Sequence, residues 1–559
     1  MSRQESATGA PGPGAARHGR SEPVLRRLTL SWSDPVAIAA ILLACGLAAF
    51  IGMPVLRVFE HDVFIMLDNA YRVSHGQVPN RDFSSAFGPL FFLIQAAGLA
   101  ISRMRPEGIG YANALFGAAV SLWIYGAARH RLAPAWACAL AVYAVLLITA
   151  PFSLGFNPLS FSYAMLYNRY GYALLAIIVL ECGLHALRTP AEAPQGPGRA
   201  LSIGAAWALA AFVKISYGIA AVPFLLVWAC CGDNRGRRLA ALCGGFAVVS
   251  AIMLCYLRFD LSDLFRDLAY AAGGRSARAR QAPMLSPVAA IESVPLLLLA
   301  ALSAGGTGGA ASCNARWQRA RVWLFVLITV GVSGFLLSTN HQAMSLPLGG
   351  FAAVLLVDSI ARHDAGGSPY APHRLLALFL GALCFLPLAT MNGVSLGAAA
   401  WERYRGPEPA AVRLESERGA SMIFGRVEGA MTSETGGPAY VEALNDGLDL
   451  IRARTEPGAG VLTIDQFNPF NYLLDRPSPR GGMAAASYKN FFSDAAHPSA
   501  GRYFGDARYV LVRKYSQSVQ DFPTEDYLIQ GLLRIYRPAL EQRFRPVAET
   551  GHWSLWRRQ

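Results

Sequence analysis

Long apolar runs, separated by short polar segments, follow one another from residue 35 to residue 391. Most have roughly the 17 to 25 residues that a helix needs to cross a bilayer, and some are slightly shorter. They do not alternate between apolar and polar residues as the strands of a membrane barrel do. We therefore expect helical spans near 35–56, 87–103, 109–127, 133–150, 171–187, 200–214, 216–231, 239–257, 286–304, 321–338, 346–361 and 374–391.

The two ends of the chain are polar and contrast with this middle part. Residues 1–34 are rich in Gly, Pro, Ser and Arg and lack the apolar core of a removable signal, so we expect a disordered cytoplasmic tail. Residues 35–395 should form a transmembrane module. Residues 396–559 carry a helical pattern at 440–454 and strand patterns at 461–465, 509–513 and 553–557, which predict a soluble α/β domain.

Composition agrees with this organisation, because 53% of the residues are hydrophobic and only 15% are charged. The sequence predicts a polytopic α-helical membrane protein with a C-terminal soluble α/β domain. The net charge of +13 comes mostly from the tail and the membrane loops, so it indicates topology rather than nucleic-acid binding. The positive-inside rule places the arginine-rich loops in the cytoplasm. These loops carry Arg129 and Arg131, Arg235, Arg237 and Arg238, Arg316, Arg319 and Arg321, and Arg362 and Arg374.

The number of apolar runs and the charges of the loops disagree about the side on which the C-terminal domain lies. Twelve simple crossings from a cytoplasmic N-terminus would return the C-terminal domain to the cytoplasm, whereas the loop charges place that domain outside. One segment between residues 87 and 150 must then be split, re-entrant or miscounted. We therefore expect eleven or thirteen crossings, within a total of about 11–13 helices.

The loop at residues 57–88, between the first two apolar runs, is the one long acidic loop in the first half of the chain. Its apolar spacing predicts a short helix from Asp62 to His75 that lies along the membrane surface, with Asp62 as its N-cap. Asp68 and Arg72 are four residues apart and should form an ion pair on one face of that helix. The loop is where chemistry would lie.

The remaining carboxylates of this loop allow two interpretations each. Asp62 is either only an N-cap or a base that takes a proton from a hydroxyl group. Asp82 is either a turn residue or a second functional carboxylate. Glu60 lies two positions before Asp62 and is a further catalytic candidate.

Several cations lie on the same predicted side of the membrane as this loop. Lys214 lies between two apolar runs, where a charge costs about 2.5 to 3.5 kcal/mol, so it either binds an anion or reaches back to the interface. Arg169, His341 and Arg81 could bind phosphate, although interface anchoring explains the first two as well. None of the nine cysteines has the spacing of a metal site or of a disulfide framework.

Two further polar segments stand out. Residues 260–284 change from acidic to basic and form either a mobile gate or a solvated connector. Residues 463–474, TIDQFNPFNYLL, combine aromatic and amide side chains that could stack on a sugar, although core packing explains the aromatic residues equally well.

The acidic loop with its surface helix, the stretch GQVPNRDF at 76–83, the stretch NPLSFSYAMLYNRYGY at 157–172 and AFVKISYG at 211–218 resemble the GT-C superfamily of polytopic glycosyltransferases. Protein O-mannosyltransferases, the aminoarabinose transferase and lipopolysaccharide galacturonosyltransferases belong to it. The resemblance implies a sugar donor on a polyprenyl phosphate and an acidic base in the first outer loop, here Asp62. Many relatives have two adjacent acids, whereas this chain has His61 before Asp62. No cofactor is therefore assigned, and a divalent metal stays an alternative.

The resulting hypothesis is an inverting glycosyltransferase of the bacterial inner membrane, with a cytoplasmic N-terminus and a periplasmic C-terminal domain. It would move a sugar from a polyprenyl-phosphate donor to a glycan or lipid acceptor. The expected site residues are Asp62, Asp82 and Glu60 for catalysis, Lys214, Arg169, Arg81 and His341 for the donor phosphate, and His61, Asn157, Tyr167 and Asn168 for substrate. The alternatives are an O-antigen ligase or polymerase and a flippase or transporter of lipid-linked sugars.

Overall fold

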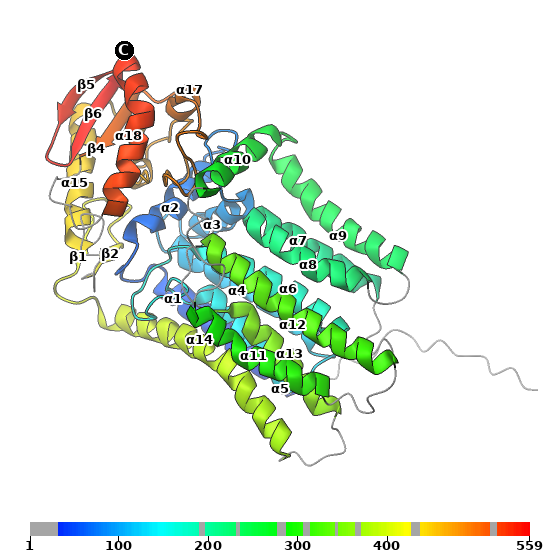
Figure 1. The fold of residues 1–559 in the computed structure, drawn as a ribbon. Coiled ribbons are helices and arrows are strands. Elements are labelled where there is room, and N and C mark those ends of the chain that lie inside the picture. The colour runs from blue at the N-terminus through cyan, green and yellow to red at the C-terminus, as the bar shows by residue number, and fades with distance from the viewer. Residues whose placement is uncertain are drawn as a thin grey trace, which may run out of the picture.

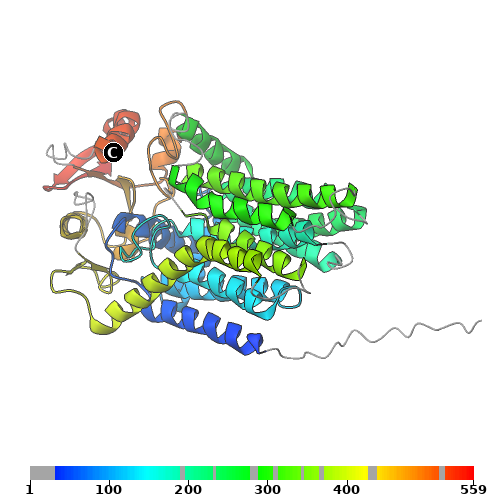
Figure 2. The same ribbon diagram turned by 60° about the horizontal axis from the view of Figure 1, so that its bottom comes forward.

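The computed structural model describes residues 32–188, 196–230, 235–276, 287–305, 313–340, 345–363, 371–425, 437–514 and 523–559. A bundle of long helices carries a smaller α/β part at one end (Figures 1 and 2). We call this end of the bundle the proximal end, and the opposite end, where the first helix begins, the distal end (Figure 2).

Each of the twelve predicted apolar runs coincides with a helix of the bundle. These helices are α1 (Ser33–Ile51), α3 (Pro89–Ile101), α4 (Gly108–Ala128), α5 (Pro134–Thr149), α6 (Leu166–Leu187), α7 (Pro197–Val213), α8 (Ile215–Cys230), α9 (Arg235–Tyr256), α11 (Pro287–Gly305), α12 (Cys313–Asn340), α13 (Pro347–His363) and α14 (Pro372–Arg405). Within the described residues, 6 helices are long and apolar enough to cross a membrane by themselves. The polytopic helical fold that the sequence predicts is confirmed. Helix α14 continues past residue 395, where the membrane module was expected to end.

Helix α3 does not run from one end of the bundle to the other. Its 13 residues span about 20 Å, less than the roughly 30 Å of a hydrocarbon core. Just before it, the Phe87 ring contacts Phe491 of the α/β part at 5.2 Å, and just after it the Met104 carbonyl accepts a hydrogen bond from the Tyr472 hydroxyl at 3.0 Å. Both ends of α3 therefore lie at the proximal end. Helix α3 lies within residues 87–150, where the sequence predicts a split, re-entrant or miscounted segment.

Ion pairs tie the helices together at the distal end, where the arginines of the loops gather. The pairs are Arg129–Asp34 (3.2 Å), Arg131–Glu181 (2.8 Å), Arg188–Asp358 (3.1 Å) and Arg362–Asp358 (2.8 Å). The carboxylates come from α1, α6 and α13, and each has a side chain that is almost fully buried. The pairs therefore compensate charges that would otherwise be costly to bury.

The α/β part contains a four-stranded sheet with the order β3-β4-β6-β5. Its strands are β3 (Val461–Ile464), β4 (Tyr509–Arg513), β5 (Phe544–Glu549) and β6 (Trp553–Arg558). Strands β3 and β4 are parallel, with Val461 opposite Tyr509, and the other neighbours are antiparallel. The predicted helix at 440–454 and the three predicted strands are all present.

Two helices cover opposite faces of this sheet. Side chains alternate along a strand, so Val461 and Tyr509 pack with α15 (Gly437–Arg454), while Leu462 and Val510 pack with α18 (Pro523–Arg543). The shorter elements of this part are β1 (Val412–Arg413), β2 (Ile423–Phe424), α16 (Phe470–Leu473) and α17 (Ala500–Phe504).

Candidate active site

The acidic loop forms helix α2 (Glu60–Ser74), which lies between the bundle and the α/β part (Figure 1). The expected N-cap is wrong by three residues. Phe59, with a left-handed φ of 50°, occupies the cap position, and Asp62 lies within the first turn, its N–H bonded to the Phe59 carbonyl at 3.0 Å. Most of the helix is buried on all sides, so it is a packed element rather than an open surface helix. The first turn of α2, with Asp62, lies where the bundle meets the α/β part.

Three of the four carboxylates in this loop are occupied by structural contacts. Glu60 is buried and accepts a hydrogen bond from the Gly437 N–H at 3.1 Å, where α15 begins. Asp68 lies 3.5 Å from Arg72, which confirms the predicted ion pair. Asp82 accepts hydrogen bonds from the Val78 N–H and from Arg81, both at 2.8 Å. Although burial acts to raise it, these donors hold the pKa of Asp82 below its ordinary value.

Asp62 differs from these three carboxylates. Its side chain is 16% exposed, and the partner within ion-pair distance is the His61 imidazole, with Nε2 3.5 Å from Oδ1. Burial raises the pKa of Asp62, and the neighbouring imidazole offsets part of that shift. A carboxylate with a raised pKa and an accessible edge is a stronger base than an ordinary surface aspartate.

The surroundings of His61 come from the α/β part. Its ring lies over Phe467 at 5.1 Å and meets the edge of Tyr440 at 6.4 Å. Asp465 follows β3 and Arg513 ends β4, so both lie at the carboxyl edge of the parallel strand pair, and both act electrostatically on Tyr440. Burial, the largest effect, raises the pKa of Tyr440.

Tyr440, Asp465 and Arg513 are not among the site residues that the sequence predicts. Asp465 and Arg513 are the last residues of two predicted strands, and this position was a usable signal, because the carboxyl ends of neighbouring parallel strands share one edge. In the aromatic stretch at 463–474, the sequence allowed either sugar stacking or core packing, and the aromatic residues differ in position. Phe467 faces His61 at the junction, whereas Phe470 is fully buried against Trp553 at 5.1 Å.

Three of the residues predicted to bind substrate or phosphate lie together at the proximal end. Lys214 caps α7, is buried with 5% exposure, and places its ammonium group 4.6 Å from the centre of the Tyr167 ring. Next to Tyr167, Asn168 accepts a hydrogen bond from the Tyr217 hydroxyl at 3.4 Å. Phe87 packs against Tyr167 at 4.5 Å. The Lys214 ammonium group therefore lies beside a wall of aromatic side chains.

Arg169, by contrast, is fully buried and directed at the protein backbone. Its guanidinium donates to the carbonyl groups of Phe152 (3.0 Å) and Leu147 (2.6 Å) and to the Asn392 side chain (2.9 Å). These bonds join the end of α5 to α6 and α14, so Arg169 has a structural role that the sequence did not reveal.

The other expected residues are spread around the same end. Arg81 pairs with the adjacent Asp82, and Asn157 is exposed, with its side chain accepting from the Leu159 N–H at 3.0 Å. His341 lies outside the described residues. Within those residues, no group of three His, Cys, Asp or Glu side chains is placed to hold a metal ion.

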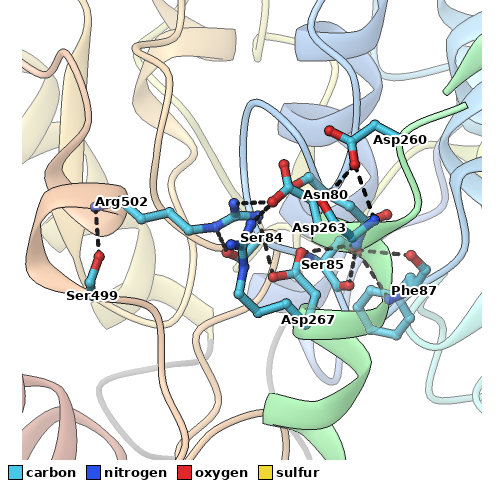
Figure 3. A network of polar contacts seen from close by, with 11 residues as sticks. Asn80, Ser84, Ser85, Phe87, Asp260, Asp263, Asp267, Ser499 and Arg502 are labelled. Carbon is cyan, nitrogen blue, oxygen red and sulfur yellow. Dashed lines mark hydrogen bonds and ion pairs between the residues drawn. The ribbon is translucent and has the colours of Figure 1, made fainter. Parts of the chain in front are cut away.

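A second network fixes the loop after α2 against the rest of the molecule (Figure 3). Arg502 of α17 donates to Asp263 at 2.9 Å and to the Ser84 hydroxyl at 3.1 Å, and lies 3.4 Å from Asp267. The buried Asp267 also accepts from Asn80 and from the Ser85 N–H, both at 2.9 Å. Asp263 and Asp267 belong to α10 (Ser262–Ser276), so the first half of the predicted gate or connector is a helix joined to both parts.

Comparison with known proteins gives limited matches. No family model and no curated protein matches the sequence. Among solved structures, ArnT from Cupriavidus metallidurans in the apo state matches with 12% identity and a TM-score of 0.35, over 94% of this chain and 96% of that one. ArnT from the same organism bound to undecaprenyl phosphate matches with 13% identity and a TM-score of 0.35, over 94% and 97%.

The oligosaccharyltransferase AglB from Archaeoglobus fulgidus, in complex with an inhibitory peptide and a dolichol-phosphate, matches with 10% identity and a TM-score of 0.37. That match covers 95% of this chain and 75% of the other. With TM-scores of 0.35 to 0.37, these matches carry no conclusion about this chain.

Proposed function

We propose that this chain is a membrane glycosyltransferase that moves a sugar from a polyprenyl-phosphate donor to a hydroxyl group of a glycan or lipid acceptor. The observation that carries the proposal is the state of Asp62. It is the one carboxylate of the acidic loop without a structural contact to the backbone or to an arginine among the described residues, and burial raises its pKa. It also lies where the bundle meets the α/β part.

The proposed reaction is a single displacement. Asp62 takes the proton from the acceptor hydroxyl, and the oxygen of that hydroxyl attacks the anomeric carbon of the donor sugar. The bond between that carbon and the phosphate oxygen breaks, so the configuration at the carbon inverts. The polyprenyl phosphate departs with the additional negative charge. Lys214 provides a cation at the same end of the bundle to stabilise that charge.

The other residues receive different roles in this proposal. Glu60 and Asp82 hold the loop in position rather than transfer protons, because their oxygens are engaged by Gly437 and by Arg81 with Val78. His61 orients Asp62. Phe87 and Tyr167 form an apolar wall suited to the first isoprenoid units of the donor.

The orientation in the membrane is part of the proposal. With α3 excluded, eleven of the twelve bundle helices remain to cross, an odd number that separates the N-terminus from the α/β part. The arginines at the distal end favour a cytoplasmic location for that end, which would place Asp62 and the α/β part in the periplasm of a bacterial inner membrane.

The test of the function is a transfer assay. The full-length purified protein, reconstituted in liposomes, would be given a polyprenyl-phosphate sugar with a radiolabel in the sugar. We expect the label to leave the polyprenyl phosphate by transfer to an added acceptor lipid extract or, slowly, to water. A flippase would move the labelled lipid between leaflets and leave the bond intact, and that outcome would exclude the proposal.

The pH dependence of transfer should reflect Asp62. The carboxylate must be ionised to accept a proton, so kcat/KM should rise up to the raised pKa of Asp62 and level off above it, with a midpoint above the usual value near 3.9. The measurement is kcat/KM between pH 4 and pH 8. His61, Tyr440 and Glu60 face the same carboxylate or its helix turn. The residual activity of Asp62→Asn should therefore lack this acidic limb, and an unchanged limb would assign it to another group.

Lys214 should contribute mainly to binding of the donor phosphate. A hydrogen bond to a charged group contributes about 1.5–3 kcal/mol, so Lys214→Met should raise the Kd for a polyprenyl phosphate roughly 10- to 100-fold. The matched control is Arg81→Gln, because the Arg81 charge is already paired with Asp82. Binding of a fluorescent polyprenyl phosphate to the purified variants measures both values. Equal affinity in Lys214→Met and the parent protein would remove Lys214 from the site.

A further inference from the structure

The distal end of the bundle contains a cavity that takes no part in the proposed reaction. It has a volume of about 350 Å³ and lies between α4, α6 and α7. Its lining includes Trp123 and Gly126 of α4, Glu181 of α6, Arg199 and Ser202 of α7, and Arg131 of the loop after α4. Arg131 belongs to the same set of distal ion pairs as Arg129 and Asp34 at the start of α1. The cavity is therefore at the opposite end of the helices from Asp62.

The lining carries more positive than negative charge. Two guanidinium groups, those of Arg131 and Arg199, share one carboxylate, that of Glu181. Arg131 is paired with Glu181 at 2.8 Å, and Arg199 interacts electrostatically with both. The first turn of α7, whose positive dipole end favours anions, forms part of the wall through Gly198.

Polar groups in the wall are held in place. The Trp123 indole N–H donates to the Ser202 hydroxyl at 2.7 Å, so the Ser202 oxygen is fixed and its own proton can point elsewhere. Arg131 is positioned by Glu181 and by a further bond to the Ala127 carbonyl at 3.2 Å. The site thus offers guanidinium and hydroxyl donors in a fixed arrangement, which is the donor set that binds phosphate oxygens.

The cavity adjoins the apolar exterior of the bundle. Leu122, which lines the cavity, is 46% exposed, and Leu201, between two lining residues, is 44% exposed. Both belong to helices of membrane-like composition, so these exposed side chains face lipid. A phosphate bound in the cavity would have acyl chains beside it. A phospholipid would contact both the polar lining of the cavity and the apolar side chains beside it, whereas a free anion would contact only the polar lining.

We propose that this cavity binds the phosphate headgroup of an anionic phospholipid from the leaflet at the distal end. The guanidinium groups and the Ser202 hydroxyl contact the phosphate, and the acyl chains lie along Leu122 and Leu201. The lipid would join α4, α6 and α7 at a point remote from the reaction. This inference does not depend on the proposed transferase activity.

Two substitutions test the site without disturbing the reaction. A Cβ at Gly126 meets no atom within 4 Å, so Gly126→Leu fills the cavity without a clash and also favours the helix. Arg199→Gln removes one charge from the lining. Gly46→Leu in α1 is the matched control, because it makes the same chemical change at another helical position with open space around it.

The experiment is native mass spectrometry of the full-length, delipidated protein with equimolar phosphatidylglycerol and phosphatidylcholine. We expect the parent protein and Gly46→Leu to retain at least tenfold more phosphatidylglycerol, and we expect Gly126→Leu and Arg199→Gln to lose that excess. Equal retention of the two lipids by the parent protein, or an undiminished excess in Gly126→Leu, would overturn the proposal.

Inorganic phosphate at millimolar concentration distinguishes the source of the anion. It should displace little phosphatidylglycerol, because it makes no contact with Leu122 or Leu201. If phosphate alone raises the Tm of the parent protein as much as the lipid does, and Gly126→Leu abolishes this effect, the site takes a soluble anion and the lipid proposal is wrong.

Discussion

Replacing Asp62 with asparagine should lower kcat for sugar transfer about 10²- to 10⁴-fold, the range that a positioned general base contributes. Asparagine keeps the size of the side chain and its ability to accept a hydrogen bond, but it cannot take a proton from the acceptor hydroxyl. The exposed edge of Asp62 and the closeness of His61 mean that little packing changes. The measurement is single-turnover transfer from a labelled polyprenyl-phosphate sugar.

The neighbouring carboxylates provide the controls for this prediction. Asp82→Asn should reduce activity only in proportion to lost stability, because its oxygens serve Arg81 and the Val78 N–H. Glu60→Gln keeps an acceptor for the Gly437 N–H and should leave kcat within a few-fold of the parent value. If Asp62→Asn is folded and fully active, or if Asp82→Asn loses as much kcat without loss of stability, the base is not Asp62.

Most of the fold could be predicted because its signals are local. The apolar runs mark the bundle helices, and the spacing at 440–454 and 509–513 marks α15 and β4. The loop arginines could also be read directly from the sequence, and they lie together at the distal end. Helix α3 has the composition of a membrane helix, yet it is short and both of its ends lie at the proximal end. Gly98 brings α3 close to α4, where an added Cβ would lie 2.1 Å from the Gly108 carbonyl oxygen, and such packing has no sequence signal of its own.

The candidate site was less predictable, because its partners come from distant parts of the chain. Glu60 is engaged by Gly437, 377 residues later, and Arg169 by Asn392, 223 residues later. Nothing near Arg169 in the sequence shows whether its guanidinium binds a phosphate or donates to backbone carbonyl groups. The pair Asp68–Arg72 was predictable because both residues lie on one helix four positions apart.

The same pair yields the second large effect. Arg72→Met should destabilise the folded protein by about 3–5 kcal/mol, the usual cost of leaving one partner of a buried ion pair uncompensated. Both side chains are almost fully buried. Arg72 also donates to the carbonyl groups of Pro479 (3.0 Å) and Gly481 (3.1 Å), so it joins α2 to the α/β part. Denaturant titration followed by far-ultraviolet circular dichroism would measure the change.

A second substitution separates the charge effect from the lost packing. In Asp68→Leu combined with Arg72→Met no charge remains buried, so a large share of the stability should return, although the two carbonyl groups still lack their donors. Arg72→Met alone should also make stability depend on pH over a wider range. Burial already raises the pKa of Asp68 to about 6 even though Arg72 acts to lower it, and without Arg72 the value should rise further.

The direction of that dependence follows from the two pKa values. The folded state holds the Asp68 proton more tightly than the unfolded chain, whose value is near 3.8, so stability falls as the pH rises through about 6 and is highest below the unfolded value. In Arg72→Met the fall should continue to higher pH, and in the double variant it should disappear. A single variant that loses less than about 1 kcal/mol and shows no added pH dependence would mean that α2 is held by its apolar contacts alone.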